Sequence, residues 1–181
     1  MRDISLHILD LAQNCIKAGA KLICISFDYQ PDGRLLIDIK DDGCGMSTDM
    51  LAQVKSPFVT SRATRRVGLG ISLWTQNAEQ SGGYVEITSA PDNGTEILAC
   101  FDTKSIDCLP LGDIIGSFLT LVISNPEQPD FVFHVCNAKE SATFDTREIK
   151  EVLGEVPLSE PSVISWMEDS LNTELKPLFG G

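Results

Sequence analysis

The chain has 181 residues, a formal net charge of −12 and a pI near 4.4. This length suffices for one large domain, or for one domain with a small addition, and for a core that needs no disulfide. The acidic excess argues against a nucleic-acid-binding protein, because neutralising phosphates requires a basic surface. An acidic chain can still bind a nucleotide, since Mg-ATP responds to the local field around its site.

The cysteines indicate a reducing compartment. They form no C-x-x-C pair and show no zinc-ligand spacing to a histidine. Most lie in apolar runs, which predicts reduced, buried thiols in a cytosolic protein. The first ten residues lack the apolar run of a signal peptide, and the longest apolar stretch, 114–123, is too short to span a bilayer. We therefore expect a cytoplasmic protein without membrane association.

The first hundred residues predict two hairpins and three helices. Apolar residues at helical spacing predict a helix over 3–18, and Gly19 ends it. Alternating β-forming residues over 21–29, a Gln30-Pro31-Asp32-Gly33 turn and a returning strand over 35–39 predict the first hairpin. The other expected elements are a short helix capped by Ser47, a helix over 70–80 and a second hairpin with strands at 84–89 and 96–101.

Residues 55–67 separate two of these helices and are irregular and basic. Lys55, Arg62, Arg65 and Arg66 make this segment the only concentrated positive charge in the chain. Such a segment next to a bound nucleotide predicts a lid that closes over phosphates.

Residues 105–181 predict a small α+β region. The expected elements are a helix from Asp113 to about Ile123, a strand over 131–136, a helix begun by Asp145 and Glu148, and a last helix from Ser159. The pattern divides the chain into a domain of residues 1–104 and a C-terminal region of residues 105–181. The sequence assigns no role to the second part.

A polar stripe follows one face of the first helix. Asp10, Asn14 and Lys17 lie at i, i+4 and i+7, and His7 lies on the same face. This stripe is either a solvated face or a ligand site. In a ligand site, the Asn14 amide oxygen would bind Mg²⁺, Lys17 would contact a phosphate and Asp10 would orient water. For His7 we favour a structural role, or a role in supporting the residues that contact the ligand.

Three glycine-containing segments follow. Asp42-Gly43-Cys44-Gly45-Met46 offers a carboxylate for the exocyclic amine of adenine and glycines that let the backbone approach the base. Gly68-Leu69-Gly70 precedes a helix near Ile71, whose N-terminus suits a phosphate. Gly94-Thr95 opens the last strand of the second hairpin. Each segment alone is also compatible with an ordinary turn.

Together, in this order and on these elements, the segments resemble the GHKL superfamily of gyrase-type, heat-shock-chaperone, histidine-kinase and mismatch-repair ATPase domains. Residues 10–20 are similar to the N box of that superfamily, and Lys17 is similar to the phosphate-binding lysine of the kinase branch. The other similarities are 42–46 to the first glycine box, 57–62 to the kinase F box, 66–73 to the second glycine box and Gly94-Thr95 to the closing Gly-Thr pair. The resemblance covers about residues 4–102.

The resemblance implies a two-layer α/β sandwich of the Bergerat type, with a mixed sheet and helices on one face. It implies bound ATP and Mg²⁺, with Asn14 as the magnesium ligand and Asp10 as the catalytic residue. The nucleotide contacts that it implies are Asn14, Lys17, Asp42, Gly43, Gly45, Met46, Phe58, Thr60, Arg65, Arg66, Gly68, Leu69, Gly70, Ile71 and Thr95.

The sequence departs from the superfamily at two positions. Arg66 stands where the kinase box usually begins with glycine, which restricts the backbone and adds a cation. Asp10 stands where glutamate is common, so its carboxylate reaches about 1.5 Å less far.

Three functions therefore stay open for what we expect to be a stand-alone, bacterial-type protein with an unidentified protein partner. The first is a nucleotide-dependent regulator with slow ATP hydrolysis. The second is a protein kinase acting in trans, similar to the anti-sigma-factor kinases. The third is a non-hydrolysing ATP-binding module. The oligomeric state stays open as well.

Overall fold

The structure, a computed structural model, describes residues 2–55 and 69–179. Six strands form one mixed sheet in the order β3-β4-β2-β1-β5-β6, with β1 and β5 parallel and every other pair antiparallel. The strands are β1 (Leu22–Tyr29), β2 (Arg34–Asp41), β3 (Tyr84–Ser89), β4 (Thr95–Asp102), β5 (Asp130–Cys136) and β6 (Ser141–Asp145).

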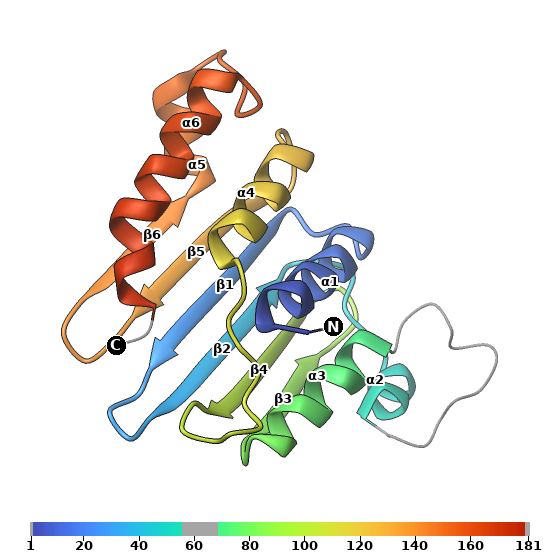
Figure 1. The fold of residues 1–181 in the computed structure, drawn as a ribbon. Helices are drawn as coiled ribbons and strands as arrows, with labels where there is room; N and C mark the ends of the chain where they lie inside the picture. The colour runs from blue at the N-terminus through green and yellow to red at the C-terminus, as the bar shows by residue number, and fades with distance from the viewer. Residues whose placement is uncertain (1, 56–68, 180–181) are drawn as a thin grey trace.

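Helices cover one face of this sheet (Figure 1). They are α1 (Ile4–Lys17), α2 (Thr48–Lys55), α3 (Leu69–Gln80), α4 (Ile114–Ser124), α5 (Thr146–Leu153) and α6 (Pro161–Ser170), followed by a π-helical turn (Leu171–Leu175) and a 3-10 turn (Lys176–Leu178). Within the described ranges, no helix is both long and apolar enough to cross a membrane.

Strand alternation explains the two layers. Successive side chains of a strand point to opposite faces, so alternate residues of β1 and β2 face the helices. On β1 these residues are Ile23, Ile25 and Phe27, and all three are fully buried. The facing residues of β4 are buried in the same way. The predicted two-layer sandwich with helices on one face is therefore confirmed.

The residues after 105 extend the same sheet. Strand β5 pairs in parallel with β1, from Leu22 opposite Asp130 to Asp28 opposite Cys136. A parallel neighbour needs a crossover connection, and α4 lies in that connection. Phe118 of α4 stacks on Phe133 of β5 with ring centroids 3.7 Å apart. The predicted α+β region thus shares one continuous core with the rest of the chain.

Strand β6 was not predicted from the sequence. Its five residues contain one fully buried apolar side chain, Phe144, so they carry almost no alternating pattern. Pairing with β5 makes the segment a strand, with Val132 opposite Asp145 and Cys136 opposite Ser141.

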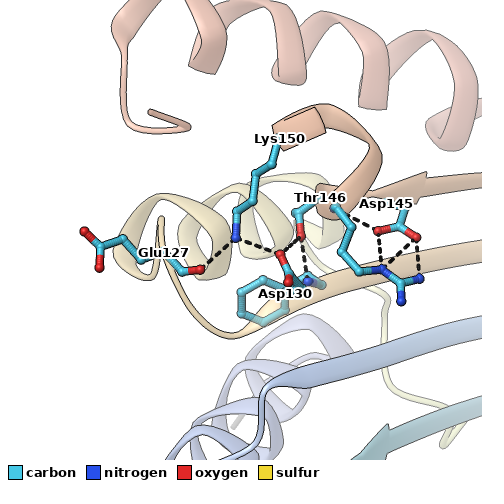
Figure 2. Close-up of polar contacts among 7 residues, drawn as sticks. Glu127, Asp130, Asp145, Thr146 and Lys150 are labelled. Carbon is cyan, nitrogen blue, oxygen red and sulfur yellow. Dashed lines mark hydrogen bonds and ion pairs between the residues drawn. The ribbon is translucent and has the colours of Figure 1, made fainter. Parts of the chain in front are cut away.

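A polar cluster joins β5, β6 and α5 (Figure 2). The buried Thr146 hydroxyl oxygen accepts a hydrogen bond from Phe131 N at 2.8 Å and donates to Asp130 Oδ1 at 3.1 Å. Lys150 Nζ lies 2.7 Å from the same Asp130 oxygen. Next to it, Asp145 caps α5 by accepting from Arg147 N. The cluster therefore satisfies the buried backbone N–H at the start of β5.

Replacing Thr146 tests this anchor. Thr146→Val keeps the shape but leaves the buried Phe131 N–H without an acceptor, so the free energy of unfolding should fall by about 1–3 kcal/mol. Urea denaturation measures the change. The control is Thr88→Val on the exposed face of β3, which should stay within about 0.5 kcal/mol of the wild type. Equal changes in both variants would contradict the anchor.

Candidate functional site

The polar face of α1 is half-buried at its centre. The helix begins where Asp3 accepts a hydrogen bond from Leu6 N, and its apolar side packs on the sheet. On the opposite side Asp10 and Asn14 are half-buried, whereas Lys17 in the last turn is exposed. Asp10 and Asn14 thus lie against other parts of the protein, which a purely solvated face would not require.

The N-terminal turn of α3 lies directly against Asp10. Gly70 is the second residue of α3, and a Cβ atom there would overlap Asp10 Oδ2. The first turn of a helix has free N–H groups and the positive end of the dipole, both of which favour a negative group. The fold therefore brings the N box and the described part of the second glycine box together.

His7 connects the same two helices one turn earlier. Its Nε2 lies 2.9 Å from Asn77 Nδ2 of α3, and its ring centroid lies 5.2 Å from that of Trp74. The side chain is buried, and this burial is the main reason why the pKa of His7 is lowered. These contacts support the structural role that we expected for His7.

The first glycine-rich loop is wedged between the end of α1 and the β3–β4 turn. Cys44 N donates to Ala18 O at 2.9 Å, and a Cβ atom on Gly43 would come within 2.9 Å of the same oxygen. Gly45 has a φ of +63°, and a Cβ atom there would overlap the backbone oxygen of Ala90. A side chain at either glycine would push the loop off its supports.

A serine that the sequence analysis did not single out holds the far side of this loop. Ser89 Oγ donates to Gly94 O at 2.8 Å and accepts from Met46 N at 2.8 Å. Because that hydroxyl proton is used, the contact of 2.9 Å to Thr95 Oγ1 is donated by Thr95. Met46 itself is buried. Nothing in the pattern around Ser89 distinguished it from an ordinary end of a strand.

The carboxylate of Asp42 has a structural task. Its Oδ1 accepts hydrogen bonds from Lys21 N at 2.7 Å and Leu22 N at 2.9 Å, which joins the start of β1 to the end of β2. The side chain is exposed. The position of Asp42 thus differs from the one expected of a carboxylate buried beside a base.

The buried carboxylate at this loop belongs to Asp41. It is 8% exposed, and its Oδ1 accepts from Gly43 N at 2.8 Å. The pKa of the Cys15 thiol on α1 is raised, chiefly by burial and next by the charge of Asp41. Asp41 pairs with Thr95 across β2 and β4, and both positions share the helix-covered face. This aspartate lies where α1, the glycine loop and β4 meet.

The sequence contained a signal for Asp41. Leu35, Ile37 and Ile39 alternate toward the core, and the next position of that series is 41. A D-x-G-x-G pattern ending at Gly45 also begins at Asp41. Both signals indicate Asp41, rather than Asp42, as the inward-pointing carboxylate of the candidate site.

Part of the predicted site falls outside the described residues, and its assignments stay predictions. These are Phe58, Thr60, Arg65, Arg66, Gly68 and the predicted lid, together with the side chain of Leu69. Ile71 is described, and its side chain points from α3 into the hydrophobic core. Across residues 2–55 and 69–179, no three His, Cys, Asp or Glu side chains cluster as a metal site.

The described residues fit a bound adenine nucleotide. Asp41 offers a buried acceptor, the close-packed glycines leave backbone rather than side chains at the loop, and Asn14 offers an amide oxygen. The start of α3 adds free N–H groups. This two-layer sandwich with a glycine loop below its first helix defines an ATP-binding domain of the GHKL type.

Residues 2–105 match the family described as histidine kinase-, DNA gyrase B-, and HSP90-like ATPase. This match covers more than half of the chain, and the chain belongs to that family. Sensor histidine kinase ZraS of Klebsiella oxytoca is 29% identical over 89 residues, covering 48% of this chain and 19% of ZraS. Signal transduction histidine-protein kinase AtoS of Escherichia coli K12 is 29% identical over 94 residues, covering 52% of this chain and 15% of AtoS.

The chain thus spans less than a fifth of the length of these two relatives. Among solved structures, the N-terminal domain of a DNA repair protein has a TM-score of 0.53 at 15% identity. The similarity covers 86% of this chain and 58% of that one. It supports the fold.

His7 predicts a pH dependence of stability. Its folded pKa is lowered, so the unfolded chain takes up a proton near pH 6.5 while the folded chain does not. Stability should therefore fall as the pH drops below about 6.5 toward the folded pKa, by at most about 1.4 kcal/mol per pH unit from this residue. Urea denaturation at pH 7.5 and 5.5 should show a smaller loss in His7→Gln than in the wild type. The control, His134→Gln, should keep the wild-type loss. An unchanged loss in His7→Gln would contradict the assignment.

Proposed function

We propose that the chain binds Mg-ATP between α1, the glycine loop and β4, and that it acts as a nucleotide-dependent regulator with slow ATP hydrolysis. The observation that carries the proposal is the buried Asp41 carboxylate at the glycine-rich loop, in a chain of this ATPase family. The Asp41 carboxylate would accept a hydrogen bond from the exocyclic amine of adenine.

The adenine end follows from hydrogen-bond complementarity. A buried carboxylate accepts hydrogen bonds and donates none, and adenine presents an amine where guanine presents a keto oxygen. Asp41 Oδ1 accepts from Gly43 N, and the Cys15 thiol is also hydrogen-bonded to this carboxylate. A carboxylate has about four lone-pair sites, so Asp41 could still accept a hydrogen bond from the base. The Thr95 hydroxyl and the buried Met46 would complete the walls around the ring. GTP should therefore bind much more weakly than ATP.

The phosphate end lies along the polar face of α1. Asn14 would supply the protein oxygen to Mg²⁺, and the exposed Lys17 is free to swing toward a phosphate. The first turn of α3 at Gly70 would face the same groups. Asp10, one turn before Asn14, would then polarise the attacking water directly or through a second water.

Phosphotransfer in trans is the second candidate, and the curated relatives favour it because several are sensor histidine kinases. Asp10 would then serve as base for an acceptor on a partner protein. We further propose that the protein is located in the cytoplasm and that it regulates a protein partner.

The two neighbouring aspartates allow a matched test of the adenine site. Asp41→Asn replaces the acceptor by an amide that can turn a donor toward the amine, so Mg-ATP affinity should fall at least tenfold, which is about 1.4 kcal/mol. Asp42→Asn keeps an oxygen that can accept from Lys21 N and Leu22 N, so its affinity for Mg-ATP should stay within about threefold of the wild-type value. Calorimetric titration measures both. The reverse order of effects would return the adenine role to Asp42.

Asp10 should separate binding from chemistry. Asp10→Asn keeps the shape that packs on Gly70, so affinity should stay within about tenfold. Any hydrolysis or phosphotransfer should fall by about 10²–10⁴-fold, the usual contribution of a general base. Asp10→Glu should keep or raise turnover if the aspartate is a short form of the usual base. Phosphate release and label transfer from γ-labelled ATP, with and without host lysate, measure this.

A wild type without measurable turnover, whose Asp10→Glu variant also gains none, would overturn the catalytic proposal. The chain would then be a non-hydrolysing ATP-binding module. Calorimetry on the same preparations keeps the two questions apart, because the adenine site is tested by affinity alone.

A further inference from the structure

An apolar groove lies between α5 and α6, on elements that contribute nothing to the nucleotide site. It has a volume of about 490 Å³. Ile149 and Val163 form its buried floor, and Val152, Leu153 and Trp166 form its sides. Helix α5 follows β6 directly, and α6 follows the loop after α5. Both helices lie at the end of the sheet opposite β3 (Figure 1).

The sides of the groove expose large apolar side chains. Val152 is 87% exposed and Trp166 is 53% exposed, although both border the same concave surface. A single exposed apolar residue is common in soluble proteins, whereas apolar residues gathered around a hollow mark a binding surface. Ile106, which is 98% exposed but does not line the groove, is an example of the common case.

The groove lies in the acidic part of the chain. Residues 105–181 contain 13 acidic and 4 basic residues, a net charge of −9 out of the −12 of the whole chain. Both basic residues of α5 are already paired with acidic residues of the same chain, as Figure 2 shows for Lys150. Arg147 pairs with Asp145 at 2.6 Å, and Lys150 pairs with Asp130 at 2.7 Å.

The acids of α5 follow its apolar edge. Glu148 lines the groove and lies one turn before Val152. Glu151 is exposed and lies three residues after Glu148, on the same side of the helix. Glu155 is exposed two residues after the helix ends. The surface around the apolar hollow is therefore negative.

We propose that this groove binds an amphipathic helix of a protein partner, with apolar residues in the groove and lysines or arginines along its edges. Helix-in-groove recognition uses apolar anchors at i, i+3 or i+4, and i+7. The ten residues of α6 span about 15 Å, which matches an anchor row of about three turns. A second copy of the chain is a poor occupant, because it would bring a similarly acidic surface to this one. The proposal goes beyond ATP binding and does not depend on it.

The two tryptophans provide a direct readout. Trp74 is fully buried under α1, whereas Trp166 is at the groove. The probe is a helical peptide of about 15 residues, made of leucines on one face and lysines on the other, without tryptophan. Binding should shift the emission of Trp166 to shorter wavelength and reduce its quenching by acrylamide. A peptide with glutamates in place of the lysines should not bind.

Two matched variants locate the binding. Val152→Gln removes an apolar side of the groove at an exposed position without changing the charge, so the fold should survive and the dissociation constant for the lysine peptide should rise at least tenfold. Ile106→Gln makes the same replacement at a similarly exposed apolar position outside the groove, and the constant should change less than twofold.

Three results would overturn the proposal. The first is the absence of binding by the lysine peptide. The second is an equal effect of Val152→Gln and Ile106→Gln, which would mean that the peptide binds the acidic surface without using the groove. The third is a concentration-dependent dimer in analytical ultracentrifugation that Val152→Gln weakens, because the occupant would then be a second copy.

Discussion

Asp41 ends β2 with its carboxylate on the helix-covered face, and the arrangement of the candidate site depends on how that charge is accommodated. Burying a carboxylate is costly unless hydrogen-bond donors replace the lost water. One donor is Gly43 N at 2.8 Å, and this contact turns the chain sharply out of the strand. The turn brings Cys44 N to Ala18 O, so the loop closes against the end of α1. A ligand amine would supply a further donor, which is a physical reason for the adenine site to lie here.

Hydrophobic periodicity predicted most of the fold. The helix at 4–17, both hairpins and the strand at 130–136 follow from alternation or helical spacing in long patterned segments. Strand β6 was missed because a short edge strand with one buried residue has little pattern to detect. The pairing of β5 with β1 was also beyond local reasoning, since it joins residues about a hundred positions apart.

The candidate site was predictable in its parts and less so in its details. The order of the motifs indicated which segments meet, and the contact of Asp10 with Gly70 agrees with that order. The choice between Asp41 and Asp42 required knowing which side chain points inward, which strand alternation gives only when it is followed to the last residue of β2. Ser89 is different, because its three hydrogen bonds arise from tertiary contacts that no local pattern encodes.

One sheet carries both the nucleotide site and the groove. Strand β2 holds Asp41, β1 lies between β2 and β5, and α5 is fastened to β5 through Thr146 and Phe131. A shared sheet does not by itself couple two sites, because coupling requires that a ligand bind two arrangements of the protein with different affinity. Strands β2, β1 and β5 are joined by backbone hydrogen bonds, which place the two sites in one framework. Any regulation of a groove partner by ATP would need two arrangements of the protein that both ligands distinguish, and by reciprocity the partner would then change the affinity for ATP by the same factor.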